Sequence, residues 1–316
     1  MKLFRRSASQ PWILSFVGAV LVFAAAVVIA GGHGAGSMAS AASSLAVFMV
    51  IVGLGQMFVV TLGPGNVDLS LPANIGLASA VAMKIMAGHD SLILLGILAA
   101  IGSGMVIGLV NYLLIAALLI PPIIATLSAS FIIQTLDISY GRGLQVKPPP
   151  GFEALSDARI LGLPALVLIA LAVSAILAVV LHRQVFGRSV LAIGQNQRAA
   201  WLAGIAVGRI RCLTYILCGA LGGLDGVLLA GYFRGSSVDI GDEYLLASIA
   251  VVVIGGTSVG GGRATVLGLW GAALFLVFLQ IMLNTLGADA GTRLLLTGLV
   301  IIGVITIAGG GRRARS

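Results

Sequence analysis

Long apolar stretches, separated by short polar ones, follow one another along the whole chain. A helix needs about 20 mostly apolar residues to cross a bilayer, and shorter helices cross when neighbours in a bundle shield them. The pattern therefore predicts an all-α, polytopic bundle of about ten transmembrane helices in a single domain, residues 1–316. The fifth and eighth helices are short, so we expect them to be tilted, broken or shielded by neighbours. The predicted spans are 12–30, 45–62, 69–86, 92–116, 123–136, 160–181, 210–230, 244–254, 264–283 and 294–308.

Polar residues interrupt this pattern most clearly between the second and third spans. The run Gly-Pro-Gly at 63–65 predicts a break in the helix. Four polar residues follow it, namely Asn66, Asp68, Ser70 and Asn74. One interpretation is that Asp68 or Ser70 caps the next helix by accepting hydrogen bonds from its free N–H groups. A compatible interpretation places the break beside a translocation path, because irregular backbone at membrane depth needs protein or a water-filled cavity around it.

A second glycine-rich break, residues 255–262, precedes another helix of small residues. Paired interruptions of this kind point to a transport route. The path candidates in this break are Gly255, Gly256, Thr257 and Ser258. Asp225 is a further candidate, because an ionisable residue in a glycine-rich span normally faces the bundle interior or a cavity. The alternatives for Asp225 are a path or dimer-interface residue and an internally bonded structural acid.

Composition and charge support a membrane protein and suggest its orientation. Hydrophobic residues make up 59% of the chain and charged ones 9%, whereas soluble domains carry about 25% charged residues. Cytoplasmic loops retain Lys and Arg, so both termini, 1–11 and 309–316, are predicted to be cytoplasmic. The predicted inside cations are Lys2, Arg5, Arg6, Arg183, Arg188, Arg198, Arg209, Arg211, Arg263, Arg312, Arg313 and Arg315. The predicted outside acids are Asp90, Asp137, Glu153, Asp157, Asp239, Asp242, Glu243 and Asp289.

Several kinds of chemistry lack the residues they need. The net charge of +8 follows from topology, so we expect no nucleic-acid partner. A P-loop needs Lys followed by Ser or Thr after a glycine-rich turn, but Lys2, Lys84 and Lys147 precede Leu, Ile and Pro. The three histidines lack metal-site spacing. We therefore predict no catalytic, metal-binding or cofactor-binding residue on this chain, and any ATP would be bound by another polypeptide.

Two longer polar segments separate the spans. Residues 139–159 contain three consecutive prolines and mixed charge, which predicts a stiff, extended loop on the outer side that either connects spans or docks an external partner; the resemblance described below implies that this side is the periplasm. Residues 182–209 form the longest cytoplasmic loop, and within it Gln195, Asn196 and Gln197 precede a helix-favouring run that Gly204 closes. The alternatives for this short helix are an interfacial anchor through Trp201 and a contact with a cytoplasmic motor.

Three segments together resemble a known family. They are GNVDLSLP (65–72), FGRSVLAIGQNQRAAWLAGIAVGRIR (186–211) and SIAVVVIGGTSVGGGRATVLGLWGAAL (248–274). In this order they resemble the inner-membrane permeases of bacterial ABC importers for sugars such as ribose, xylose and arabinose, within the branched-chain amino acid and ribose permease superfamily. The resemblance covers residues 45–308, and the Ile-Gly-Gln-Asn run at 193–196 favours the sugar branch. Asn66 and Pro72 replace glycines of the family pattern.

The resemblance implies an ATP-driven importer of a sugar or polyol that works by alternating access. Two permeases, the same chain or paralogues, would pair in the membrane lipid. A cytoplasmic ATPase would bind ATP and Mg²⁺ beneath them, and a periplasmic binding protein would deliver the solute. Residues 195–205 would be the coupling helix, in which small side chains permit close approach to the ATPase. The coupling residues implied are Gln195, Asn196, Arg198, Ala199, Ala200, Gly204 and Ile205.

Other functions remain open alternatives. An ABC permease of this superfamily could instead carry a branched-chain amino acid or a nucleoside. A proton-coupled secondary transporter would use Asp68 and Asp225 as relay groups and would work without an ATPase. A membrane-embedded enzyme would need a polar catalytic cluster at one interface, and we find none in the sequence.

Overall fold

The computed structural model describes residues 11–142, 146–160 and 162–310. Over these residues the protein is a bundle of helices, and its one sheet is an antiparallel hairpin of β1 (Arg159–Ile160) with β2 (Leu163–Pro164). Seven helices in the described part are long and apolar enough to cross a membrane. The predicted all-α, polytopic bundle is therefore confirmed.

Each of the ten predicted spans overlaps a helix. These helices are α2 (Pro11–Ile29), α3 (Ala35–Thr61), α4 (Leu71–Met86), α5 (Ile93–Leu118), α6 (Pro122–Gly141), α8 (Ala165–Arg183), α11 (Val207–Tyr232), α12 (Tyr244–Ile254), α13 (Val266–Thr285) and α14 (Ala290–Gly310). The shorter elements are η1 (Asp90–Leu92), α7 (Pro150–Asp157), α9 (Val185–Gln195), α10 (Gln197–Leu202) and η2 (Val238–Gly241).

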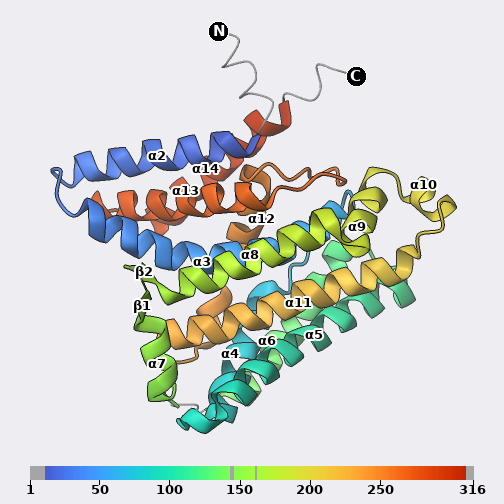
Figure 1. The fold of residues 1–316 in the computed structure, drawn as a ribbon, viewed down its shortest axis with the longest axis horizontal. Coiled ribbons are helices and arrows are strands. Elements are labelled where there is room, and N and C mark those ends of the chain that lie inside the picture. Colours follow the sequence, from blue (N-terminus) through green and yellow to red (C-terminus); the bar gives the residue numbers. More distant parts are fainter. Residues whose placement is uncertain (1–10, 143–145, 161, 311–316) are drawn as a thin grey trace.

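Helix α3 forms the centre of the bundle. In its spanning window 94% of the residues are buried, against 17% in α2. Helices α8, α11, α12 and α13 pack around it, and Figure 1 shows α2, α13 and α14 on one side of α3 and α8, with α4, α5 and α6 on the other. Apolarity alone does not explain this, because α2 is the more apolar of the two. Glycines of α3 permit close packing, since a Cβ at Gly55 would lie 3.2 Å from the Cα of Cys218 on α11.

Glycines bring α5 and α11 into backbone contact. Gly104 and Gly108 on α5 face Gly219 and Gly223 on α11, and a Cβ at Gly104 would overlap the carbonyl oxygen of Gly219. Small residues four apart on two helices permit this close approach in membranes. This close packing holds α11 with its polar face turned towards α3 and α4.

Three segments differ from the sequence prediction. The fifth span, expected to be short, is α6 with 20 residues, and it includes Asp137, which is 2% exposed, and the start of the predicted outer loop. Residues 150–157, expected to be extended, form helix α7, because Pro150 stands in its first turn, where a fixed φ favours a helix start. Residues 185–195, expected to be loop, form α9 ahead of the predicted short helix. The polar run that begins at Gln195 predicts the start of a single helix, α10. Gln195 is also the last residue of α9.

The polar connections gather at two ends of the bundle (Figure 1). Helices α9 and α10 and the turn after α12 lie at one end, which we call the coupling end. Helix α7, the hairpin and the turn after α11 lie at the other, which we call the outer end. Of the cations predicted to lie inside, Lys2, Arg5, Arg6, Arg312, Arg313 and Arg315 fall outside the described residues. Which end faces the cytoplasm stays a prediction.

Candidate translocation path and coupling segment

The chain between α3 and α4 is irregular and runs back into the bundle. Gly63 and Gly65 have positive φ values of 126° and 79°, which glycine adopts at little cost. The backbone N–H of Asp68 then donates to the side-chain oxygen of Gln56 on α3 at 3.2 Å. Helix α4 begins only after this turn and has 16 residues, about 24 Å, which is less than the roughly 30 Å of a bilayer core. The predicted break is confirmed.

Asp68 lies at the centre of a buried polar cluster. Its Oδ1 accepts hydrogen bonds from the backbone N–H of Ser70 at 2.9 Å and from the Ser70 hydroxyl at 2.7 Å. Asn111 of α5 donates to Asp68 Oδ1 at 3.3 Å and to Ser70 Oγ at 2.7 Å. Asp68 is 2% exposed and Asn111 is fully buried. The cluster therefore joins α3, the irregular segment and α5 through polar contacts in the core.

The predicted side-chain cap of α4 is wrong. Ser70 is the N-cap residue, but its side chain makes no cap hydrogen bond, because its hydroxyl donates to Asp68. Asp68 accepts from the N–H of Ser70, which precedes the helix. By contrast, Asp289 does cap α14, since its carboxylate accepts the Thr292 N–H at 2.7 Å; this bond lowers the pKa of Asp289. Asp68 therefore stabilises the turn that enters α4.

Helix α6 also contacts the segment. The Thr126 hydroxyl accepts the N–H of Leu69 at 3.0 Å and donates within α6. Sequence reasoning missed Gln56, Asn111 and Thr126. Gln56 and Asn111 are the only amide side chains in α3 and α5, and that was the available signal, because polar residues at membrane depth are rare and face the bundle interior. Thr126 is one of several polar residues in α6, so nothing in the sequence singled it out.

One face of α11 carries polar residues along the irregular segment. Arg211 donates to Asn66 at 3.1 Å, and the Tyr215 hydroxyl lies 3.5 Å from the same oxygen. Further along α11, Asn74 of α4 donates to the carbonyl of Gly219 at 2.9 Å. Asp225 follows on the same face and is fully buried. From Arg211 to Asp225 this face extends for about 21 Å along the helix.

Several buried polar atoms along this face have no hydrogen-bond partner among the described residues. They are Gln56 Nε2, Asn74 Oδ1, Asn111 Oδ1 and both carboxylate oxygens of Asp225. Leaving such a group unsatisfied costs about 1–3 kcal/mol, so its presence in a folded protein calls for water, a solute or a second conformation. We call Asn66, Asp68, Ser70, Asn74, Asn111 and Asp225, together with Gln56, the polar row.

The second glycine-rich break has a different setting. Gly256, Gly261 and Gly262 have positive φ, and Thr265 closes the turn by donating to the Gly255 carbonyl at 2.6 Å. Among the described residues, no hydrogen bond joins Gly255, Gly256 or Thr257 to the polar row, and the buried hydroxyl of Thr257 has no partner. These three predicted path residues therefore have no direct bond to Asp68 and its neighbours.

The two breaks meet the end of α9 at one junction. The N–H of Gly262 donates to the Thr61 carbonyl at 3.0 Å, and Gln195 donates to the Gly262 carbonyl at 3.4 Å. A Cβ at Gly194 would overlap both the Thr61 carbonyl oxygen and the Gly262 nitrogen. We call Thr61, Gly194, Gln195 and Gly262 the junction. It places the loop that carries α10 directly on both breaks.

Helix α10 is the predicted short, capped helix. The side chain of Asn196 accepts the Ala199 N–H at 2.9 Å at its start. Gly204 has a φ of 85° at its end, and the N–H of Ile205 donates to the Ala200 carbonyl at 3.1 Å. These are the bonds of an N-cap and of a Schellman-type C-terminus, so this prediction is confirmed.

The exposed face of α10 differs from the one expected. Ala200 is 4% exposed and packs inside the chain, whereas Trp201 and Leu202 are 64% and 71% exposed. Ala199 and Gly204 are exposed, as are Gln195, Asn196 and Arg198, and Ile205 is half-buried. Ala200 is thus wrong as a contact residue for a partner. A cavity of about 400 Å³ beside α10 is lined by Trp201 and residues 204–209.

Comparison with known proteins gives consistent results. Residues 38–305 match the family described as "Branched-chain amino acid transport system / permease component". The ribose import permease protein of Bacillus subtilis is 34% identical over 256 residues, covering 80% of this chain and 78% of the relative. The galactose/methyl galactoside import permease protein of Escherichia coli is 30% identical over 278 residues, covering 82% of each. The autoinducer 2 import system permease protein LsrD of Yersinia enterocolitica is 30% identical over 249 residues, covering 76% and 75%. No solved structure matches the chain.

Proposed function

Because the chain belongs to the family of branched-chain amino acid transport system permease components, we propose that its polar row carries a neutral sugar or polyol through the membrane. The protein is a multi-pass membrane permease subunit of a sugar-type ABC importer. As such it is a transport component. The proposal adds the class of solute, the residues along its route and the direction of movement.

The unsatisfied polar atoms of the polar row are the observation that carries this proposal. They include both kinds of group: Gln56 Nε2 is a donor, and the Oδ1 atoms of Asn74 and Asn111 are acceptors. A sugar hydroxyl both donates and accepts, so it complements such a mixed set. Asp68, Asn111 and Asp225 are at most 2% exposed in this structure, so the proposed route needs a rearrangement that opens the row to one side of the membrane.

We further propose that α10 contacts a cytoplasmic ATPase. Trp201 and Leu202 form an exposed apolar pair at the coupling end, and aromatic anchors are typical of interface centres. ATP and Mg²⁺ would be bound by that ATPase. A second permease, the same chain or a paralogue, and a periplasmic binding protein would complete the importer, with both termini cytoplasmic in the bacterial inner membrane.

Transport by the reconstituted importer tests the function. The permease, its ATPase and its binding protein are placed in proteoliposomes, and uptake of D-ribose, D-galactose, L-leucine and a nucleoside is compared. We expect ATP-dependent uptake of a neutral sugar. Uptake of leucine or a nucleoside alone would favour the other importer classes. Uptake driven by a pH gradient without ATP would overturn the importer mechanism in favour of a proton-coupled carrier.

A matched pair of variants tests the coupling surface. Leu202→Glu places a charge on the exposed face of α10, and Leu163→Glu places one on the exposed outer-end hairpin, where the leucine is 46% exposed. We expect Leu202→Glu to abolish most solute-stimulated ATP hydrolysis at normal protein level, because a buried unpaired charge disfavours the interface. Leu163→Glu should leave it unchanged. Equal effects of the two variants would contradict an ATPase contact at α10.

A further inference from the structure

The outer end holds a polar cavity that neither the polar row nor the coupling segment includes. Its volume is about 410 Å³. Its side chains come from the segment between α11 and α12 and from the first residue of α12, and they are Phe233, Ser236, Ser237, Asp239, Ile240, Glu243 and Tyr244. We call it the outer pocket.

The segment that builds the outer pocket folds back over α4. Helix α11 ends at Tyr232, and the chain turns through Arg234, whose φ is 59°. Ser236 then hydrogen-bonds to Ser79 of α4 at 2.6 Å. A Cβ at Gly241 would overlap the Pro72 carbonyl at the start of α4, so the segment lies directly on that helix.

Tyr244 connects the outer pocket with the polar row. It lines the pocket at the start of α12, yet it is only 7% exposed. Its phenol also lies within electrostatic range of the Asp225 carboxylate, and neither Asp225 oxygen has a partner among the described residues. The buried end of the pocket therefore adjoins the outer end of the polar row.

The lining chemistry is that of a site for hydroxyl groups. Ser236, Ser237, Asp239 and Glu243 supply hydroxyl and carboxylate oxygens that accept hydrogen bonds from a polyol. Phe233 is 57% exposed and offers an aromatic face to C–H groups. Sites for small molecules combine such apolar surface with a few convergent polar groups.

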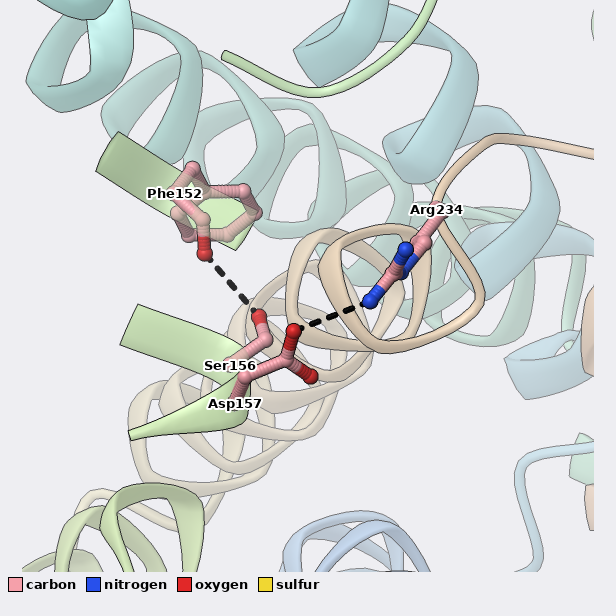
Figure 2. A network of polar contacts seen from close by, with 4 residues as sticks. All are labelled: Phe152, Ser156, Asp157 and Arg234. Carbon is pink, nitrogen blue, oxygen red and sulfur yellow. Dashed lines mark hydrogen bonds and ion pairs between the residues drawn. The ribbon is translucent and has the colours of Figure 1, made fainter. Parts of the chain in front are cut away.

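The charge of the pocket disfavours anions. Asp239 and Glu243 are its only ionisable carboxylates, and no lysine or arginine is among its lining residues. The nearest cation along the chain, Arg234, donates to Asp157 of α7 at 3.0 Å, and Figure 2 shows its guanidinium directed to that carboxylate. A phosphorylated solute would meet two negative charges without a counter-charge.

We propose that the outer pocket is the entry site for the neutral sugar or polyol before it reaches the polar row, and that its two carboxylates exclude phosphorylated sugars. The inference rests on the proposed function for the direction of transport. It adds a binding site and a basis for selectivity at residues distinct from the polar row.

Protection of an introduced thiol tests the site without the binding protein. Ser237→Cys places a thiol in the pocket, and the full-length permease in lipid nanodiscs is treated with a small polar thiol reagent. The unsubstituted protein measures the background from Cys212 and Cys218, of which Cys218 is buried. Ser91→Cys, an exposed outer-end position outside the pocket, is the matched control.

We expect D-ribose, D-galactose or xylitol to slow labelling of Ser237→Cys and to leave Ser91→Cys unchanged. Binding at twice the dissociation constant would slow it about threefold, because the free fraction is one over 1 + [L]/Kd. D-ribose 5-phosphate should give no protection. Adding Asp239→Asn and Glu243→Gln to Ser237→Cys should let the phosphate protect, because the charge barrier is gone.

The outcomes separate this proposal from the function it rests on. Labelling that no neutral solute slows, or that slows equally at Ser91→Cys, overturns the entry site even if sugar uptake proceeds. Protection by D-ribose 5-phosphate equal to that by D-ribose in the wild-type lining overturns the charge selection. Absence of sugar uptake in the complete importer together with protection of Ser237→Cys overturns the proposed function and leaves the pocket as a sugar site.

Discussion

The two glycine-rich breaks look alike in the sequence but differ in what they do in the structure. The first, residues 62–70, leaves α3 and runs into the bundle, where Asp68 and Ser70 are buried among polar partners. The second, residues 255–265, forms a closed turn at the coupling end, held by Thr265. Only the first carries side chains of the polar row.

The difference lies in the residues that follow each glycine run. Asn66, Asp68 and Ser70 can satisfy irregular backbone and one another, so the first segment remains stable at membrane depth. After Gly260, Gly261 and Gly262 the chain has Arg263, whose charge keeps the second turn near an end of the bundle. Glycine therefore permits a break, and the neighbouring side chains determine how deep it lies.

The largest expected effect is at the junction where the two breaks touch. Gly194→Ala puts a Cβ on the Thr61 carbonyl and the Gly262 nitrogen, so both breaks must separate from α9. Overpacking costs about 1–3 kcal/mol or more when backbone must shift. We expect a strong loss of folded protein or of ATP-driven uptake, measured by thermal unfolding and by uptake per permease.

Gly260→Ala is the matched control for that change. It lies in the second break, and its new Cβ would be 3.6 Å from the Ser258 hydroxyl oxygen, which is ordinary van der Waals contact. Stability and uptake should remain near wild type. Equal behaviour of the two variants would show that the junction is not a tight contact between the breaks.

The next effect separates charge from hydrogen bonding in the first break. Asp68→Asn keeps an acceptor for the Ser70 N–H and hydroxyl, so most ATP-driven uptake should remain, with little change between about pH 6 and 8, since a neutral solute needs no titrating group. Asp68→Leu removes every acceptor and leaves buried donors unsatisfied at about 1–3 kcal/mol each. It should impair folding or uptake.

Uptake in proteoliposomes at several pH values, normalised to the amount of permease, distinguishes these outcomes. Loss of uptake in Asp68→Asn at normal protein level would mean that the negative charge itself is required. That result would return the proton-coupled carrier to consideration.

A smaller effect tests whether the N-cap of α10 matters for coupling to the ATPase rather than for the stability of the whole fold. Asn196→Ala removes the N-cap bond to Ala199, which typically costs about 0.5–2 kcal/mol. Because α10 is exposed, we expect weaker solute-stimulated ATP hydrolysis with little change in global unfolding temperature. Asn196→Ser, which keeps an acceptor at the N-cap, should leave ATP hydrolysis near wild type. A global loss of stability in Asn196→Ala alone would contradict a local role.

Much of the fold could be predicted from the sequence because lipid is the solvent for most of the chain. Runs of apolar residues long enough for a bilayer locate helices whatever their neighbours, and all ten predicted spans overlap a helix. The caps of α10 were also predictable, since Asn196 and Gly204 act on backbone within a few residues. Local chemistry and a uniform environment were sufficient in these cases.

The polar row was only partly predictable because its contacts are long-range. Asn111 meets Asp68 from a helix that begins 25 residues later, and nothing in either local sequence states that they touch. Ala200 faces inward for the same reason, since its helical position and not its size determines what it contacts. Apolar periodicity locates helices in lipid but does not assign their facing partners.

The smallest expected effect compares one hydroxyl in each break. Thr265→Val removes the bond to the Gly255 carbonyl and keeps the side-chain shape, so it should cost about 0.5–1.5 kcal/mol and leave uptake near wild type. Ser70→Ala removes a hydroxyl that donates to Asp68 and accepts from Asn111, so both partners lose a bond in the core and the cost should be larger. Thermal unfolding of the two purified variants, with uptake measured in parallel, makes the comparison. If Thr265→Val were as destabilising as Ser70→Ala and stopped uptake as well, the second break would share the structural and transport role that we assign to the first.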